Sequence, residues 1–298
     1  MKIGIAGTGK MGTAMGARLL ELKHEVHVWN RSAARTRPLL DQGARSAATP
    51  AELAGRCDAV LTILTDAAAI EAVYKGTDGL LSGNVGGRLF IEMSTVSSST
   101  ERALAPAVAA SGAALVECPV GGSTTPAREG KLFGFLGGSD ADAARARPLL
   151  EQLCRRVEHV GGIGSGSAMK LAINLPLAVY WEALGEAVSL VRDAGIAPEK
   201  LIEIMTESSG GTNVLRNRGP KLVAALKEGP KAEVGFDIDG MGKDLRTMLA
   251  VGGAMGIDLP VTAKALDCYE AASRAGWGNR DASNLVAHRL EQAKSAKR

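Results

Sequence analysis

The chain has 298 residues, 46% of them hydrophobic and 3% aromatic, which suits one large or two modest domains with a substantial core. A formal net charge of only +3, without a basic block interleaved with aromatic residues, gives little support to nucleic-acid binding. Four scattered cysteines and four histidines without metal-ligand spacing argue against a zinc site and indicate reduced thiols in the cytosol.

The first twelve residues, MKIGIAGTGKMG, read as a short buried strand over Lys2–Ala6 that leaves no room for a signal peptide. Glycines follow in G-x-G-x-x-G spacing: Gly7 permits a tight turn, Gly9 lets the backbone approach a pyrophosphate, and Gly12 lets the next helix pack closely. The N-terminus of that helix, predicted over Thr13–Leu22, offers unpaired N–H groups to phosphates. We therefore expect a nucleotide cofactor to contact this segment at Gly7, Gly9, Lys10, Met11 and Gly12.

The second predicted strand, Glu25–Trp29, ends at the point where a dinucleotide site reads the ribose, about twenty residues beyond the glycines. No acid stands there to bind the ribose hydroxyls of NADH. Asn30 is neutral, Arg31 can pair a phosphate, and Ser32 adds a hydroxyl donor. This trio favours NADPH over NADH.

The rest of the first half alternates apolar strands with helical stretches. Strands are predicted over Ala59–Leu64, Leu89–Met93, Ala114–Cys118 and Leu132–Leu136, with Val157–Val160 at an edge. Helices are predicted between them over Ala51–Ala54, Ala67–Val73, Ser99–Ser111 and Asp140–Leu153. Repeated βα units predict an α/β fold, a Rossmann-type doubly wound parallel sheet with helices on both faces.

Two strand ends carry residues suited to a ligand, because ligands of doubly wound sheets bind at the carboxyl ends of strands. Ser94 and Thr95 follow one strand and can reach nicotinamide and substrate, or can cap the helix that starts near Ser98. Another strand runs into a loop in which Gly121, Gly122 and Ser123 could form a nest for a carboxylate. A plain structural turn explains that loop equally well.

A glycine-rich stretch, Gly161–Gly166, ends the alternating pattern, and helical periodicity takes over. We predict a Rossmann domain over residues 1–162 and an all-α C-terminal domain over 163–298. Its helices are predicted over Ala168–Ala194, Pro198–Glu207, Lys221–Ala225, Met241–Met255 and Pro260–Ala275. The first is too apolar to sit exposed and contains too many polar residues for a membrane span, so we expect it at a domain or subunit interface of a homodimer or homotetramer.

Lys170 opens the helical region, and Asn174 follows one turn later on the same helix face. A lysine in a partly desolvated cleft can protonate a carbonyl oxygen as hydride arrives, because burial lowers its pKa toward the working range. The asparagine can hold the substrate oxygen or fix the lysine rotamer. Taken alone, Lys170 would be a surface lysine, and Lys243 and Asp244, at the start of a later helix, would be a solvated cap.

These segments, in this order, resemble the β-hydroxyacid dehydrogenase family, over the chain from Gly7 to about Leu249. The resemblance implies Lys170 as the catalytic residue with Asn174 supporting it. It also implies nicotinamide contacts from Leu64, Thr65 and Thr95, substrate contacts from the loop Gly121, Gly122 and Ser123, and closure over substrate and cofactor by Phe236, Lys243 and Asp244. The trio at 30–32 resembles the NADPH-using glyoxylate/succinic-semialdehyde reductase branch.

Three residues depart from the family pattern. Gly121 stands where the loop usually carries Ser, Thr65 where Pro is common, and Pro176 lies within the long helix. These departures bear on the substrate more than on the chemistry.

The resulting hypothesis is an NADPH-dependent oxidoreductase that interconverts a small carboxylate-bearing aldehyde or 2-oxo acid and its hydroxy acid. Lys170 would serve as general acid and base, and Asn174 and Thr95 would orient the carbonyl. Two alternatives stay open. One is an imine reductase on the same scaffold, made plausible by Gly121, and the other is a dinucleotide-binding sensor without catalysis.

Overall fold

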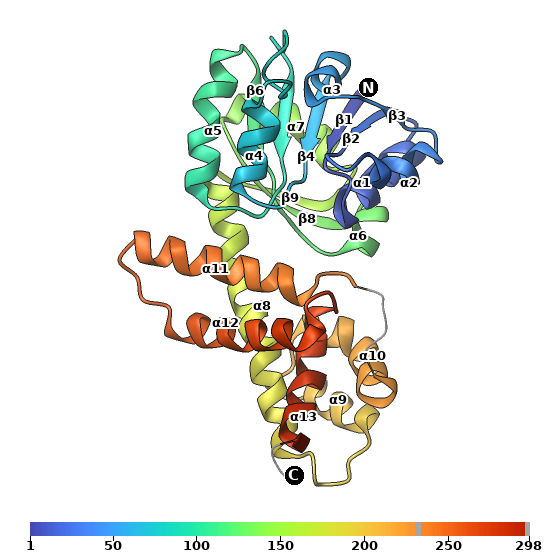
Figure 1. The fold of residues 1–298 in the computed structure, drawn as a ribbon, viewed down its shortest axis with the longest axis vertical. Coiled ribbons are helices and arrows are strands. Elements are labelled where there is room, and N and C mark those ends of the chain that lie inside the picture. The colour runs from blue at the N-terminus through green and yellow to red at the C-terminus, as the bar shows by residue number, and fades with distance from the viewer. Residues whose placement is uncertain (230–233, 296–298) are drawn as a thin grey trace. The chain divides into compact units, whose positions relative to one another are not determined.

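The computed structural model describes residues 1–229 and 234–295, which are drawn in colour in Figure 1. The chain divides into two compact units, Met1–Ala172 and Ile173–Arg298. The division falls within the long helix α8 (Ser165–Leu190), whose first two turns belong to the first unit.

A nine-stranded sheet forms the centre of the first unit (Figure 1). Its main part consists of parallel strands in the order β3-β2-β1-β4-β5-β6, which reverses direction between β1 and β4. The bounds are β1 (Lys2–Ala6), β2 (Glu25–Trp29), β3 (Arg45–Ser46), β4 (Ala59–Thr62), β5 (Leu89–Glu92) and β6 (Ala114–Glu117). The predicted doubly wound parallel arrangement is confirmed over these six strands.

The far edge of the sheet departs from the parallel pattern. The strand β8 (Leu132–Gly137) runs antiparallel to β6 and to the short β7 (Val120–Gly121). The last strand, β9 (Cys154–Gly161), pairs parallel with β8 alone and so forms the predicted edge. The pairing changes from parallel to antiparallel because the chain turns back through β7 and the short helix α6 (Thr124–Arg128). A connection this short can join only antiparallel strands.

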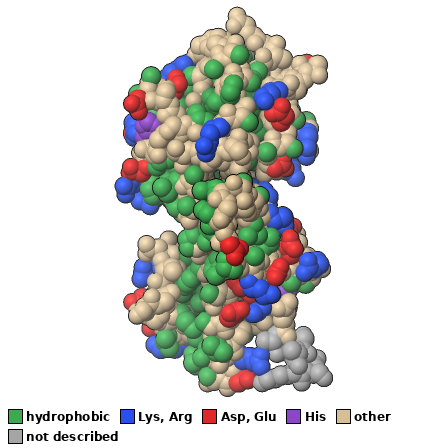
Figure 2. Space-filling view, turned by 90° about the vertical axis from the view of Figure 1, so that its left-hand side faces the viewer, with side chains coloured by type: hydrophobic (Ala, Val, Ile, Leu, Met, Phe, Trp, Pro, Cys, Tyr) green, Lys and Arg blue, Asp and Glu red, His purple; other side chains and the backbone are tan. Residues whose placement is uncertain are grey.

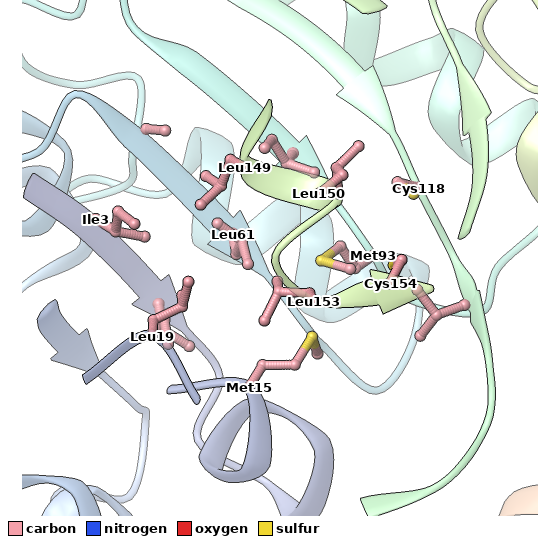
Figure 3. Close-up of a cluster of buried hydrophobic side chains, with 14 of the residues drawn as sticks. Ile3, Met15, Leu19, Leu61, Met93, Cys118, Leu149, Leu150, Leu153 and Cys154 are labelled. Atoms are coloured by element: carbon pink, nitrogen blue, oxygen red, sulfur yellow. The ribbon is translucent and has the colours of Figure 1, made fainter. Parts of the chain in front are cut away.

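Helices cover both faces of the sheet, because successive strand residues point to opposite sides. Ile3, Leu61 and Ile91 pack with α1 (Lys10–Glu21) and α7 (Asp140–Leu150) on one face, in the cluster drawn in Figure 3. The opposite side of the same strands packs against α3 (Pro50–Arg56), α4 (Ala67–Lys75) and α5 (Ser98–Ala110), through residues such as Val60 and Phe90. The remaining short helices are η1 (Ala33–Thr36) and α2 (Arg37–Leu40).

The described part of the second unit is helical. After α8 come α9 (Pro198–Glu207), α10 (Asn213–Glu228), α11 (Ile238–Ala254), α12 (Pro260–Ala272), η2 (Ser273–Trp277), η3 (Ala282–Asn284) and α13 (Leu285–Ser295). Pro176 removes one backbone donor but does not end α8, which continues to Leu190. None of the helices in the described ranges is long and apolar enough to cross a membrane.

Several apolar side chains reach the surface of the second unit, and they are the green areas in the lower half of Figure 2. The large ones are Ile173, Leu190, Ile196, Ile204, Met255, Ile257 and Val261. All four cysteines are free thiols, with Cys57, Cys118 and Cys154 buried and Cys268 half-buried. Burial raises the pKa of Cys57 and of Cys154 to about 12.

Candidate functional site

The glycine turn lies where the strand order reverses, between β1 and β4, which is where doubly wound sheets bind their ligands. Gly7 has a φ of +102°, and a side-chain carbon there would lie 2.2 Å from the carbonyl oxygen of Ile63 at the end of β4. A side-chain carbon on Gly12 would lie 2.0 Å from the carbonyl oxygen of Gly7. Only glycine fits these two positions, so the residues that the sequence assigned to a tight turn and close helix packing do have those tasks.

The N-terminus of α1 differs from those of α3, α4, α5 and α7 in the same unit. The helices α3, α4, α5 and α7 each begin with a side chain that accepts a backbone N–H, from Thr49, Asp66, Ser97 and Ser139. The residue before α1 is Gly9, so no side chain caps the helix, and a side chain there would point into open space. Lys10 is exposed and Met11 half-buried beside this space. The uncapped amides and the space in front of them fit the pyrophosphate of a dinucleotide.

The three residues after β2, residues 30–32, differ in their surroundings. The Asn30 side chain accepts a hydrogen bond from the Thr8 amide at 3.1 Å and donates to the Ser32 carbonyl oxygen at 3.0 Å. Asn30 therefore fixes the loop against the glycine turn. The side chains of Arg31 and Ser32 are exposed next to it.

The loops after β4 and β5 are joined by a hydrogen bond from the Leu64 amide to the Ser94 hydroxyl, at 2.8 Å. Ser94 is therefore occupied in holding these two loops together, and the cap of α5 is Ser97 instead. Leu64 and Thr95 are half-buried, and Thr65 is exposed. The four residues predicted to contact nicotinamide or substrate thus lie on two adjacent loops at one end of the sheet.

Buried polar groups stand at the carboxyl ends of three adjacent strands, in register: Thr62 on β4, Glu92 on β5 and Glu117 on β6. The Glu92 carboxylate accepts from the Thr62 hydroxyl at 2.5 Å and from the Ser94 amide at 2.6 Å. Burial raises the pKa of Glu92 to about 7 and also raises the pKa of Glu117, because a charged carboxylate loses its hydration inside the protein.

A third buried carboxyl, Glu101, lies in the first turns of α5 and is 1% exposed. Neither of its oxygens has a hydrogen-bond partner among the described residues. Burial, with the charges of Glu92 and Glu117 adding to it, raises the pKa of Glu101 to about 10. A neutral Glu101 at pH 7 follows from that value.

The loop after β6 contains the predicted carboxylate nest. Gly121 ends β7, Gly122 follows with a φ of +125°, and Ser123 stands at the N-cap position of α6, whose amides it does not cap. A side-chain carbon at Gly121 would meet Phe133 and Phe135 only at 3.8 Å, an ordinary contact. The structure therefore has room for a side-chain carbon at position 121, where a serine is expected from the family resemblance.

Lys170 is 8% exposed and lies in the second turn of α8, within the first unit. It is therefore not the surface lysine that its sequence neighbourhood alone suggests. Asn174, one turn later, is also buried, and its side-chain amide donates to the Asp244 carboxylate at 3.0 Å.

Asp244 is buried within α11 and forms an ion pair with its neighbour Lys243 at 2.9 Å. Because α11 begins at Ile238, both residues lie in its second turn, and the interpretation as a solvated cap is wrong. Phe236 is half-buried just before α11, and its carbonyl oxygen accepts from the Ala282 amide at 2.9 Å. In the second unit the structure thus joins Asn174 with Asp244 and Lys243.

The comparisons with known proteins cover both units. Residues 2–161 match a family model described as the NAD-binding domain of 6-phosphogluconate dehydrogenase. Residues 164–289 match one described as the NAD-binding domain of NADP-dependent 3-hydroxyisobutyrate dehydrogenase.

Curated relatives match over nearly the whole chain. The chain is 33% identical to a 3-hydroxyisobutyrate dehydrogenase of Pseudomonas aeruginosa, covering 92% of each. It is 30% identical to glyoxylate/succinic semialdehyde reductase 1 of Arabidopsis thaliana, covering 96% of this chain and 97% of the relative. A solved 3-hydroxyisobutyrate dehydrogenase from Salmonella typhimurium superimposes with a TM-score of 0.84 at 26% identity, over 96% of this chain and 99% of that one.

Proposed function

The chain belongs to the β-hydroxyacid dehydrogenase family and is a nicotinamide-dependent oxidoreductase, and from that premise we propose which reaction its residues serve. The reaction is the interconversion of a small carboxylate-bearing aldehyde or 2-oxo acid with its hydroxy acid. Bound NADPH supplies the hydride for the reduction. In the reduction, the Lys170 ammonium would give a proton to the carbonyl oxygen as negative charge develops there. In the reverse direction the neutral amine takes the proton from the hydroxyl.

The observation that supports this proposal is the burial of Lys170 and Asn174 on one helix face. A lysine with 8% of its surface exposed is rarely kept without a task, because desolvating an ammonium is costly. Asn174, fixed by Asp244, supplies a side-chain amide of defined orientation one turn from the amine. In this proposal Lys170 is the general acid and Asn174 helps to orient the carbonyl.

The substrate carboxylate is assigned to the loop of Gly121, Gly122 and Ser123. The loop offers backbone N–H groups and the Ser123 hydroxyl at the end of the sheet that also carries the glycine turn. Such groups bind an anion without a charged side chain. An aldehyde or oxo acid with a carboxylate a few bonds from the carbonyl matches this arrangement.

A screen of carbonyl compounds tests the proposal directly. NADPH oxidation is followed with succinic semialdehyde, glyoxylate and other small oxo acids, beside matched aldehydes that lack the carboxylate and beside cyclic imines. We expect turnover of the carboxylate-bearing carbonyls and weak turnover of their uncharged analogues. Preferred reduction of cyclic imines would indicate the imine reductase instead, and cofactor binding without any turnover would indicate a sensor.

The preference for NADPH is assigned to Arg31 and Ser32, whose exposed side chains follow β2 where the ribose is read. We expect Arg31→Ala to weaken NADPH binding by about tenfold or more, since a charge-assisted phosphate contact is worth roughly 1.5–3 kcal/mol. NADH affinity should change much less. Dissociation constants for both cofactors, measured by their fluorescence, give the comparison.

The matched control is Arg37→Ala, which removes an exposed arginine paired with Asp41 in the same region. Equal losses for NADPH and NADH in the Arg31 variant would contradict the assignment. So would an unchanged NADPH affinity.

We also propose that the protein is a homodimer or homotetramer. The support is the number of large apolar side chains left exposed on the second unit, among them Ile173 and Leu190 on α8. Exposed apolar surface of this kind marks interaction sites.

A further inference from the structure

The Glu117 carboxylate lies at the end of β6 and is held by four donors from the start of α8. One oxygen accepts from the amides of Gly164 at 2.5 Å and Gly166 at 2.9 Å. The other accepts from the Ser167 amide at 3.2 Å and the Ser167 hydroxyl at 2.5 Å. Glu117 is fully buried, so no water competes for these bonds. The carboxylate therefore takes the place of the N-cap of α8, although it stands nearly fifty residues away in sequence.

The backbone packs closely around the Glu117 carboxylate. A side-chain carbon on Gly166 would lie 2.3 Å from the Phe135 carbonyl oxygen and 3.3 Å from the Glu117 carboxyl carbon. A side-chain carbon on Gly137 would lie 2.4 Å from a Glu117 oxygen. Two backbone segments thus close on the carboxylate from either side, and the first turn of α8 is held at one place on the sheet.

Lys170 stands three and four residues beyond Ser167 and Gly166, so it continues the same face of the helix. Its position relative to the sheet therefore depends on where the first turn of α8 is held. Two residues after Glu117 the chain enters the loop that contains Gly121 and Ser123. A single carboxylate thus ties the start of the lysine-bearing helix to the strand that leads into the carboxylate-binding loop.

We propose that Glu117 is the positioning residue of the reaction: through its four hydrogen bonds it places the Lys170 amine relative to the loop of residues 121–123. This inference rests on the proposed role of Lys170. Glu117 touches neither substrate nor cofactor in this assignment and acts through the helix alone.

The chemistry of the contact selects a test variant. All four partners of Glu117 are N–H or O–H groups, which a carboxylate accepts on both oxygens. In Glu117→Gln the shape is kept, but one oxygen becomes an NH₂ group, which cannot accept a hydrogen bond from a backbone amide. Ser167→Ala removes a single bond and leaves the backbone amides in place. Glu101→Gln is the matched control, because it alters a buried glutamate nearby that makes no hydrogen bond to any described residue.

The first readout does not depend on enzyme activity. Lysines of the native protein are acylated with an N-hydroxysuccinimide ester, and the modification of Lys170 is followed over time by peptide mass spectrometry. A displaced helix start should expose the amine, so we expect faster modification of Lys170 in Glu117→Gln, a smaller increase in Ser167→Ala, and the wild-type rate in Glu101→Gln. Unchanged modification in both Glu117→Gln and Ser167→Ala would overturn the proposal.

The second readout is kinetic. We expect Glu117→Gln to lower kcat by about 10²-fold, since displacement of a catalytic group by about 1 Å has an effect of this size. The primary deuterium isotope effect on kcat, measured with NADPH deuterated at the transferred position, should rise as the chemical step becomes slower. NADPH affinity and binding stoichiometry should stay at wild-type values. A variant that merely loses folded molecules would show a reduced stoichiometry and an unchanged isotope effect, and that pattern counts against positioning.

If Glu117→Gln does not fold, Ser167→Ala decides the question with the same two readouts, and wild-type behaviour there rejects the inference. Failure of the proposed function looks different. In that case the wild-type protein reduces none of the carbonyl compounds, or Lys170→Ala remains active, whatever the Glu117 variants do.

Discussion

Replacement of Lys170 by alanine is expected to lower kcat by about 10²–10⁴-fold, the range typical of a general acid–base group. The variant should bind NADPH as the wild type does, because the cofactor is assigned to the glycine turn and to residues 30–32. The effect should appear in kcat and in kcat/KM alike, since the proton is needed only as the carbonyl oxygen gains charge in the transition state.

Steady-state kinetics on the best substrate of the carbonyl screen, with cofactor binding followed by fluorescence, measure this expectation. Lys170→Arg keeps the positive charge but should fail to restore activity, because a guanidinium does not give up its proton near neutral pH. Small primary amines added to Lys170→Ala should restore part of the rate. Lys200→Ala, at an exposed lysine of α9, is the control for removing a lysine. Retention of most of the wild-type kcat in Lys170→Ala would reject the assigned role.

The second large effect concerns stability and comes from Glu101. Its pKa of about 10 in the folded protein lies far above the value of 4.5 for a solvated glutamate. Folding therefore takes up a proton throughout the interval between pH 4.5 and about 10. Below pH 4.5, Glu101 is protonated in both the folded and the unfolded chain, so it adds no pH dependence to the free energy of unfolding. Within the interval, each unit of increasing pH lowers the free energy of unfolding by up to about 1.4 kcal/mol.

Glu101→Gln removes this titration and keeps the shape of the side chain. The variant should match the wild type near pH 4.5 and exceed it by a few kcal/mol at pH 8, since the term accumulates over several pH units. Urea denaturation at pH 5, 6.5 and 8 measures the free energies of unfolding. Glu21→Gln, at an exposed carboxyl of α1, should show no such growing difference. A stability difference independent of pH would show that Glu101 does not titrate in this interval.

The features that the sequence predicts well are those with a local signature. The glycine turn has fixed spacing, apolar runs such as Leu89–Met93 mark the strands, and the βα alternation predicts the parallel order. Each of these depends on residues that are close together along the chain. The sequence does not predict the helices α6 and α13, because their segments, Thr124–Arg128 and Leu285–Ser295, lack a clear apolar stripe.

The parts of the site that could not be predicted depend on long-range contacts. Glu92 and Glu117 look like ordinary acids at the ends of strands, and only the sheet register places them side by side and buried. The sequence signal that could identify Glu92 and Glu117 is that each of them ends an apolar run, where a solvated acid is unexpected. The sequence alone predicts a cap at Asp244, because its partner Asn174 lies 70 residues earlier.

The Glu117 contact also makes the site depend on distant parts of the chain. Its hydrogen bonds span 47 to 50 residues, and between their two ends the chain runs through β8 and β9. Closing so long a loop costs entropy that local helix formation does not. A synthetic fragment containing α8 alone would therefore lack the contact that fixes the position of Lys170 relative to the sheet.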